Sequence, residues 1–192
     1  AGGVFSSQLE NLVVAGFVGE SVPIYANLDS RYKKYYLSDP YLCFYFAFIK
    51  PVLQKIKSGQ ENIFLKIANG PKYYSFLGKA FENVCLSHAQ KVASILGFSG
   101  IEYNVGSLYD KKAQIDLIFD RADSVLTICE IKFRQSPIGV SIIKEMESKI
   151  NLVQERFPKR TIQKVLITHS DATKDLVNTG YFFKIIQSSE LF

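Results

Sequence analysis

Apolar and polar positions divide the chain into a mostly helical first part and a second part in which helices and strands alternate. In the first part, a helical pattern ends at Gly16, and Asp39 before Pro40 has the form of a helix start with Asp39 as its N-cap. The pattern predicts helices over 6–15, 40–49, 51–57 and 61–68, and short strands over 18–25 and 34–37 around a wing-like polar loop. Residues 1–70 therefore have the outline of a partial winged-helix module.

The second part begins after Asn69-Gly70-Pro71, which we interpret as a domain boundary. A long helix over 76–96 should precede strands over 101–107, 112–119 and 124–133, a helix over 140–157, and strands over 164–168 and 181–186. In the 140–157 helix, Ile143, Met146, Ile150 and Val153 repeat at spacings of three and four, which is an amphipathic stripe. The predicted order αβββαββ makes residues 71–192 a mixed α/β domain.

Composition narrows the class of protein without identifying its function. The 192 residues are 47% apolar, enough for a sizeable core, and the formal charge of +5 is compatible with a polyanionic partner. Three isolated cysteines and two histidines do not make a structural zinc site, and free buried thiols suit a reducing cytoplasm. The longest apolar run, 41–49, is too short to span a membrane. Because the chain opens with Ala1, we expect a fragment of a longer protein.

Carboxylates lie inside apolar runs of two predicted neighbouring strands, where burial is costly unless the charge is paired. Asp116 lies between Ile115 and Leu117, and Glu130-Ile131-Lys132 lies in an almost wholly apolar segment. The period of a strand puts Glu130 and Lys132 on one face. An edge-strand Asp and a solvated strand face are the alternative interpretations. We favour a hard-cation site beside an ammonium group, which is suitable equipment for phosphodiester hydrolysis.

Further residues complete the predicted site. Glu82, on the long helix, would hold a metal-bound water or a second ion, or would be an ordinary solvated helix residue. The Ile131 carbonyl would be a further metal ligand, and Lys132 would orient water or stabilise phosphate charge. The candidate nucleic-acid contacts are Lys79, Arg134, Lys33 and Lys34, with Arg31 and Tyr32 beside the last two. Each of them could instead be an ordinary surface charge or a member of a helix ion pair. His88 should be a packed or capping residue, and His169 a loop residue at a strand end.

The order of elements and these acids resemble the PD-(D/E)XK nuclease fold, whose common core is αβββαβ. In that family the site consists of an acid on the first helix, an Asp on the second strand and a (D/E)-x-K on the third. The matching positions here are Glu82, Asp116, Glu130 and Lys132, with Ile115 where the family usually has proline. The resemblance implies a restriction-endonuclease-like core that uses Mg²⁺ or Mn²⁺ to cleave DNA.

The resemblance extends upstream. Residues 35–46 look like the Y-x-L-x-D-P-x-x-x-F-x-F stretch of archaeal-type AAA+ ATPases, which also occur in bacteria, and 78–82 resembles their G-x-x-F-E segment. This resemblance implies the C-terminal region of such an ATPase, with a winged-helix remnant followed by a nuclease-like domain. The sequence contains no G-x-x-x-x-G-K-[ST], so the chain itself should not bind ATP by a Walker mechanism.

Three functions follow from these patterns. The first is a Mg²⁺-dependent deoxyribonuclease, supported by the complete acidic set with Lys132. The alternative is a non-catalytic DNA-binding or regulatory module of the ATPase, whose DNA binding should weaken as salt rises. The third is a protein-interaction domain, which the many tyrosines and phenylalanines allow. The sequence leaves substrate structure and oligomeric state open.

Overall fold

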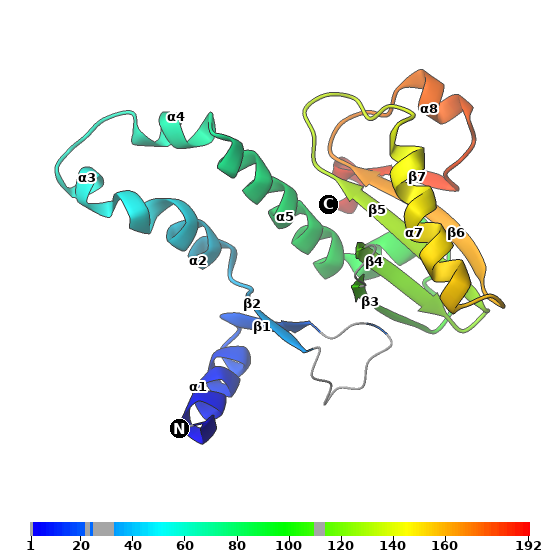
Figure 1. Cartoon of the computed structure of the whole chain (residues 1–192), viewed down its shortest axis with the longest axis horizontal. Coiled ribbons are helices and arrows are strands. Elements are labelled where there is room, and N and C mark those ends of the chain that lie inside the picture. The colour runs from blue at the N-terminus through cyan, green and yellow to red at the C-terminus, as the bar shows by residue number, and fades with distance from the viewer. Residues whose placement is uncertain (1, 22–23, 25–32, 110–113) are drawn as a thin grey trace. The chain divides into compact units, whose positions relative to one another are not determined.

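The computed structural model describes residues 2–21, 24, 33–109 and 114–192 (Figure 1). The chain divides into two compact units: unit 1 is Ala1–Val22 with Ala26–Phe76, and unit 2 is Pro23–Tyr25 with Leu77–Phe192. The division falls inside one continuous helix, α5 (Pro71–Ser87). The first residues of α5 pack within unit 1, where the rings of Phe48 and Phe76 meet edge to face. A functional boundary at residue 70 stays a prediction.

Unit 1 contains the predicted helices and a β-ribbon. Strands β1 (Val18–Ser21) and β2 (Lys34–Leu37) pair antiparallel. Asp39 caps α2 as predicted, because its Oδ1 accepts a 2.7 Å hydrogen bond from the Leu42 amide and Pro40 is the first helical residue. The helices are α1 (Gly2–Val14), α2 (Pro40–Phe44), α3 (Leu53–Lys57) and α4 (Ile63–Ala68). The rest of the predicted 18–25 strand and the wing-like loop, with Arg31 and Tyr32, lie outside the described residues, apart from Ile24 and Lys33.

Pro51 changes the helix type without ending the helical path. A π-helical turn (Tyr45–Ile49) and a 3₁₀ turn (Lys50–Val52) connect α2 to α3. Proline has no N–H to donate to the carbonyl four residues earlier, that of Ala47. Lys72 Nζ donates to this carbonyl at 3.0 Å, so a side chain from α5 supplies a hydrogen bond at the place where the proline cannot. The predicted interruption is therefore an irregular turn.

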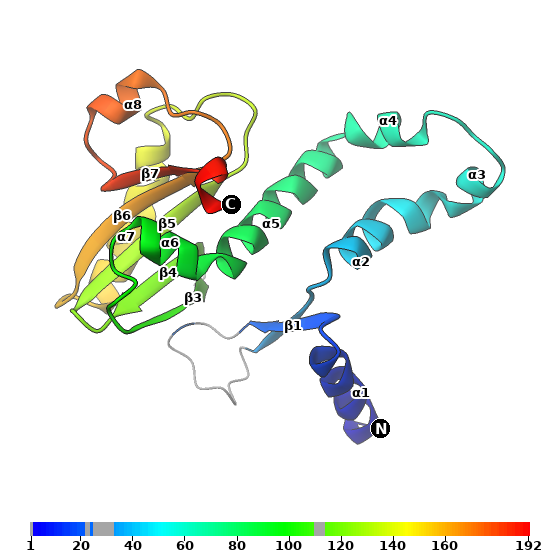
Figure 2. The same cartoon turned by 180° about the vertical axis from the view of Figure 1, so that it is seen from behind.

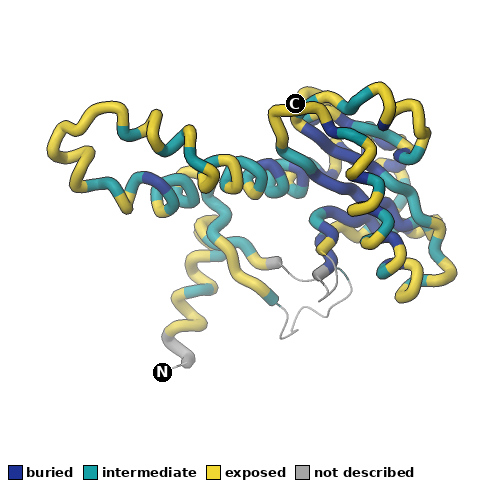
Figure 3. Tube along the Cα trace, turned by 45° about the horizontal axis from the view of Figure 1, so that its top comes forward, coloured by how far each residue is buried: buried dark blue, intermediate teal, exposed yellow. Residues whose placement is uncertain are grey.

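Buried apolar residues are concentrated in unit 2 (Figure 3). Among the described residues of unit 1, Phe48 is the one buried apolar side chain, while Tyr41, Phe46 and Phe64 are exposed. No helix in the described ranges has the length and apolar character needed to cross a membrane.

In its described residues, unit 2 contains a five-stranded mixed sheet in the order β3-β4-β5-β6-β7. The β3–β4 and β4–β5 pairs are antiparallel, and the β5–β6 and β6–β7 pairs are parallel. Because β5 is the middle strand, six of its eight residues are buried. The strands are β3 (Tyr103–Tyr109), β4 (Gln114–Arg121), β5 (Val125–Lys132), β6 (Thr161–Thr168) and β7 (Lys184–Gln187).

Helices cover both faces of this sheet (Figures 1 and 2). The end of α5 and α6 (Ala89–Ile95) pack with Cys129 and Ile131 on one face. On the other face, α7 (Ile142–Arg156) packs its stripe against Leu126 and Ile128. The predicted 76–96 helix is interrupted at His88, and a short helix, α8 (Lys174–Asn178), was not predicted. The mixed α/β class is confirmed.

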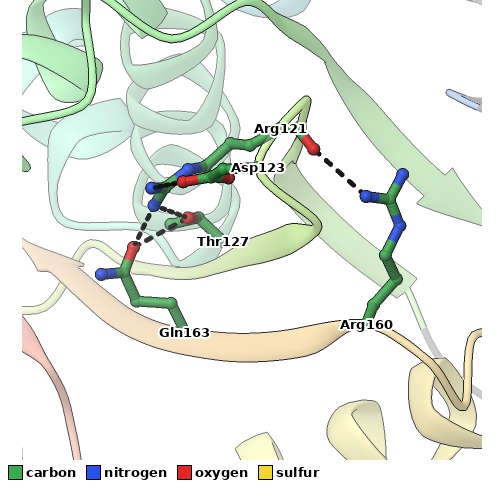
Figure 4. A network of polar contacts seen from close by, with 5 residues as sticks. All are labelled: Arg121, Asp123, Thr127, Arg160 and Gln163. Atoms are coloured by element: carbon green, nitrogen blue, oxygen red, sulfur yellow. Dashed lines mark hydrogen bonds and ion pairs between the residues drawn. The ribbon is translucent and has the colours of Figure 1, made fainter.

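A polar cluster links three strands at the end of the β4–β5 hairpin (Figure 4). Arg121 bonds Asp123 and Gln163, and its guanidinium lies 4.4 Å from the centroid of the Phe98 ring. Thr127 also donates to Gln163, at 2.8 Å. Since these side chains bond one another across β4, β5 and β6, we interpret the cluster as a structural tie in the sheet.

Candidate active site

Strand β5 presents Glu130 and Lys132 on the face that α7 covers. Leu126 and Ile128, at the same alternation, pack in the core cluster that contains α7. Glu130 is 1% exposed, and its Oε1 lies 2.9 Å from Lys132 Nζ. The predicted same-face geometry of the E-x-K motif is therefore present, and the acid is deeply buried beside the lysine.

Helix α7 adds two charged residues to this pair, which the sequence interpretation had missed. Lys149 Nζ donates to Glu130 Oε2 at 2.6 Å, and Glu145 Oε2 lies 2.7 Å from Lys132 Nζ. Glu145 and Lys149 are four residues apart, so both point from the same side of the helix. The result is an alternating series of charges, which we call the four-charge cluster: Lys149, Glu130, Lys132 and Glu145.

Within this cluster, the charge of each residue favours the ionised form of its neighbour. Burial alone would lower the pKa of Lys132, but the close contacts with Glu145 and Glu130 and their negative charges raise it overall. The hydrogen bond from Lys132 lowers the pKa of Glu145, and the positive charges of Arg134 and Lys149 add to that effect. Glu145 is thus held ionised by three cationic side chains that gather at the end of β5 and on α7.

Asp116 lies one step beyond the end of the β4–β5 ladder. The last pair in that ladder is Leu117 with Cys129, and the β3–β4 register shifts between Gly106 and Leu108, so regular pairing on both sides of β4 is interrupted next to Asp116. Asp116 is half-buried, and its Oδ1 accepts a 2.8 Å hydrogen bond from Gln114 Nε2. Asp116 therefore lies at an interruption in the pairing of β4 with its neighbours.

Glu82 lies on α5, which covers the opposite face from α7. Burial raises the pKa of the Cys85 thiol to about 12, and the negative charges of Glu82 and Asp116 add to this rise. Both carboxylates are therefore near Cys85. Lys79 Nζ lies 2.7 Å from Glu82 Oε2, which is the ordinary i,i+3 helix pair that was the alternative interpretation of Lys79.

The donor set fits a hard divalent cation in part. In the part of the chain that the structure describes, no three His, Cys, Asp or Glu side chains are grouped so as to hold a metal ion. Mg²⁺, however, is commonly held by one or two carboxylates and several waters. Glu130 Oε1 is buried without an aligned hydrogen bond, and Asp116 is a half-buried carboxylate on the neighbouring strand β4. These two acids are the residues that suit such an ion.

The remaining predicted residues have varied surroundings. Ile131 is 5% exposed within the β5–β6 ladder, and Arg134 is exposed just beyond β5. Lys33 forms a 3.2 Å ion pair with Glu20, and Lys34 is exposed on β2. Lys33 and Lys34 belong to unit 1 and the other candidates to unit 2.

The histidines make packing contacts, and of the three thiols expected to be buried, Cys85 and Cys129 are buried whereas Cys43 is half-buried. His88 Nδ1 lies 2.9 Å from the Val84 carbonyl at the break between α5 and α6. His169 follows β6, and its ring stacks on Phe133 with centroids 4.7 Å apart. The three cysteines, all among the described residues, are free thiols, and burial raises the pKa of Cys129 and of Cys85.

Comparison with known proteins places the chain in a family. Residues 45–150 match DUF234, described as archaeal and bacterial proteins of unknown function. The match spans more than half of the chain, so the chain belongs to this family. An uncharacterized protein of Methanocaldococcus jannaschii is 27% identical over 127 residues, which are 66% of this chain and 28% of that protein. The chain thus matches little more than a quarter of that relative's length.

Two solved structures are similar to part of the chain. A repair endonuclease from Pyrococcus abyssi has a TM-score of 0.40 at 11% identity, covering 57% of this chain and 46% of the other. A complex of EndoMS with double-stranded DNA has a TM-score of 0.33 at 13% identity, covering 52% and 43%. At such low similarity, the function has to be inferred from this chain's own residues.

Proposed function

We propose that this member of the DUF234 family carries, in unit 2, a nuclease-like domain that hydrolyses DNA phosphodiester bonds. The observation that carries the proposal is Glu130, which is 1% exposed on the middle strand and lies 2.9 Å from Lys132 Nζ. A buried ion pair seldom stabilises a fold more than apolar residues of similar volume would, so stability alone does not explain its presence. Its place on the strand next to the one that carries Asp116, just past the last β4–β5 pair, favours a chemical role.

The chain's own residues would have distinct roles in this reaction. Glu130 and Asp116 would hold Mg²⁺ or Mn²⁺, which when bound supplies Lewis-acid stabilisation of phosphate charge. Lys132 would orient the attacking water or stabilise negative charge on the phosphoryl oxygens. Arg134, just beyond the motif, would contact the DNA backbone. Glu82 and the Ile131 carbonyl remain proposed as further ligands, to water or to the ion.

The wider context is also a proposal. The resemblances at residues 35–46 and 78–82 support an origin in the C-terminal region of an AAA+ ATPase-type protein of the cytoplasm, with unit 1 as the winged-helix remnant. In that setting Lys33, Lys34 and Lys79 would be additional phosphate contacts, although Lys33 and Lys79 already form ion pairs with acids.

The test is cleavage of labelled single-stranded, duplex and branched DNA with Mg²⁺, Mn²⁺ or EDTA. We expect metal-dependent cleavage by the wild-type chain and its loss in Glu130→Ala and Lys132→Ala. Cleavage by these variants at the wild-type rate would contradict the assignment of Glu130 and Lys132 to a nuclease active site. DNA binding that weakens with salt, without cleavage, would instead support the non-catalytic regulatory module.

A further inference from the structure

Lys149 is one of the two residues of the four-charge cluster that sequence patterns did not indicate. It projects from α7 toward the middle of the sheet, and its side chain is 15% exposed. Its ammonium group lies 2.6 Å from Glu130 Oε2 and donates a hydrogen bond to it. A side chain buried to this degree has little surface for DNA, so any role in cleavage must act through Glu130.

The two oxygens of Glu130 have different partners. Oε2 accepts the aligned hydrogen bond from Lys149. Oε1 lies 2.9 Å from Lys132 Nζ but has no aligned hydrogen bond, although it is buried. A hydrogen bond that holds one oxygen of a carboxylate also restricts the position of the other oxygen. The contact of Lys149 with Oε2 therefore restricts where Oε1 lies. Oε1 is thus the oxygen that faces the lysine of the E-x-K motif.

We propose that Lys149 is a positioning residue of the active site. It holds the Glu130 carboxylate through Oε2, so that Oε1 is presented beside Lys132 for the divalent cation. This inference rests on the proposed nuclease function. Glu145, one helix turn before Lys149 on the same side of α7, has the corresponding relation to Lys132, with its Oε2 2.7 Å from Lys132 Nζ. The helix thereby orients both residues of the motif on β5.

A purely structural ion pair is the competing explanation, and the experiment separates the two. Lys149→Met removes the ammonium at similar length, Lys149→Arg keeps the charge and hydrogen bonding, and Lys144→Met is the control at an exposed position of α7. For each variant of the 192-residue chain, we would measure the Mn²⁺ affinity by calorimetry and the kcat and KM for DNA cleavage. The measurements are made at a temperature where circular dichroism shows the variant to be folded.

We expect Lys149→Met to weaken Mn²⁺ binding and lower kcat by about 10–100-fold, the usual effect of losing a residue that orients a metal ligand. KM for DNA should be unchanged, Lys149→Arg should recover much of the loss, and Lys144→Met should match the wild type. Wild-type Mn²⁺ affinity and kcat in folded Lys149→Met would overturn the inference. If Lys149→Met does not fold, Lys149→Gln replaces it, with the same two outcomes.

Failure of the underlying function gives a different result. If the wild-type chain neither binds Mn²⁺ through Glu130 nor cleaves DNA, Glu130→Gln and the wild type will be indistinguishable in both measurements. In that case the proposed nuclease fails, and the positioning role fails with it. If the wild type binds Mn²⁺ and cleaves but Lys149→Met does so equally, only the role of Lys149 is overturned.

Discussion

At the scale of single residues, the environment of each ionisable side chain in unit 2 separates those that pack from those that suit chemistry. Glu130 is buried and pairs with the half-buried Lys132 near one end of β5. Cys85 and Cys129 are instead buried between α5 and the sheet, where burial raises the pKa of both thiols. Such thiols are poor nucleophiles, because the reactive thiolate is disfavoured. They should affect stability rather than catalysis.

The Cys85 thiol predicts a loss of stability in alkaline solution. Its folded-state pKa of about 12 exceeds the unperturbed value of 9.0, so between these pH values the unfolded chain releases a proton that the folded chain keeps. The free energy of unfolding should therefore fall as pH rises above 9.0, by up to about 1.4 kcal/mol per pH unit for this group. Denaturation of wild type and Cys85→Ala across this range should show a shallower decline in the variant. Parallel declines would contradict the assignment.

At the scale of elements, α7 links the core to the candidate site. Its buried stripe packs on the sheet, while Glu145 and Lys149 on the neighbouring side contact the E-x-K residues of β5. The stripe itself was predictable from spacing, and so was the shared face of Glu130 and Lys132. The pairing of Lys149 with Glu130 was not, because it depends on the rotation of α7 against the sheet. An acid and a lysine four residues apart on α7 were the available signal.

Irregular backbone explains the other differences between prediction and structure. The break at His88 was hidden because the apolar spacing of 76–96 continues through it, and α8 is only five residues long.

Glu82 was expected to join Asp116 and Glu130 at one ion. In the structure Glu82 pairs with Lys79, and its negative charge acts with that of Asp116 on the Cys85 thiol, so its role at an ion stays a prediction. Sequence order placed these acids on the right elements but could not give their side-chain directions.

The packing of α7 gives a direct test by mutation. Met146 is fully buried in the cluster between α7 and the sheet. Met146→Ala should lower the free energy of unfolding by about 2–5 kcal/mol, because it removes buried surface and leaves a cavity. Lys144→Ala, exposed on the same helix, should change it by less than about 0.5 kcal/mol. Urea denaturation measures both values, and similar small effects would show that α7 does not pack on the sheet as described.

At the scale of the whole molecule, the two units differ in how much apolar surface they bury. Within its described residues, unit 1 buries one apolar side chain, Phe48, whereas unit 2 has two clusters of buried residues on the two faces of its sheet. Since burial of apolar surface is the main favourable contribution to folding, unit 2 should be the more stable of the two.

Hydrogen exchange should reveal this difference. We expect amides of β5 and β6 to exchange slowly, at rates near the limit set by global unfolding, and those of α2 to α4 to exchange much faster through local opening. Mass spectrometry of peptides from the intact chain would measure both sets. Equal protection of residues 40–68 and of the sheet would contradict the uneven distribution of core residues.

The central claim is that Glu130, with Lys132, performs metal-dependent cleavage of DNA. Its most direct test is the single-turnover rate of DNA cleavage in Mg²⁺ for wild type, Glu130→Gln and Glu155→Gln, the last being an exposed glutamate of α7. We predict that Glu155→Gln cleaves like the wild type. The cleavage rate of Glu130→Gln should fall by more than about 10–100-fold, which is the decrease expected when a residue that only orients a metal ligand is lost. Equal rates for Glu130→Gln and the wild type, or no metal-dependent cleavage by either, would contradict the claim.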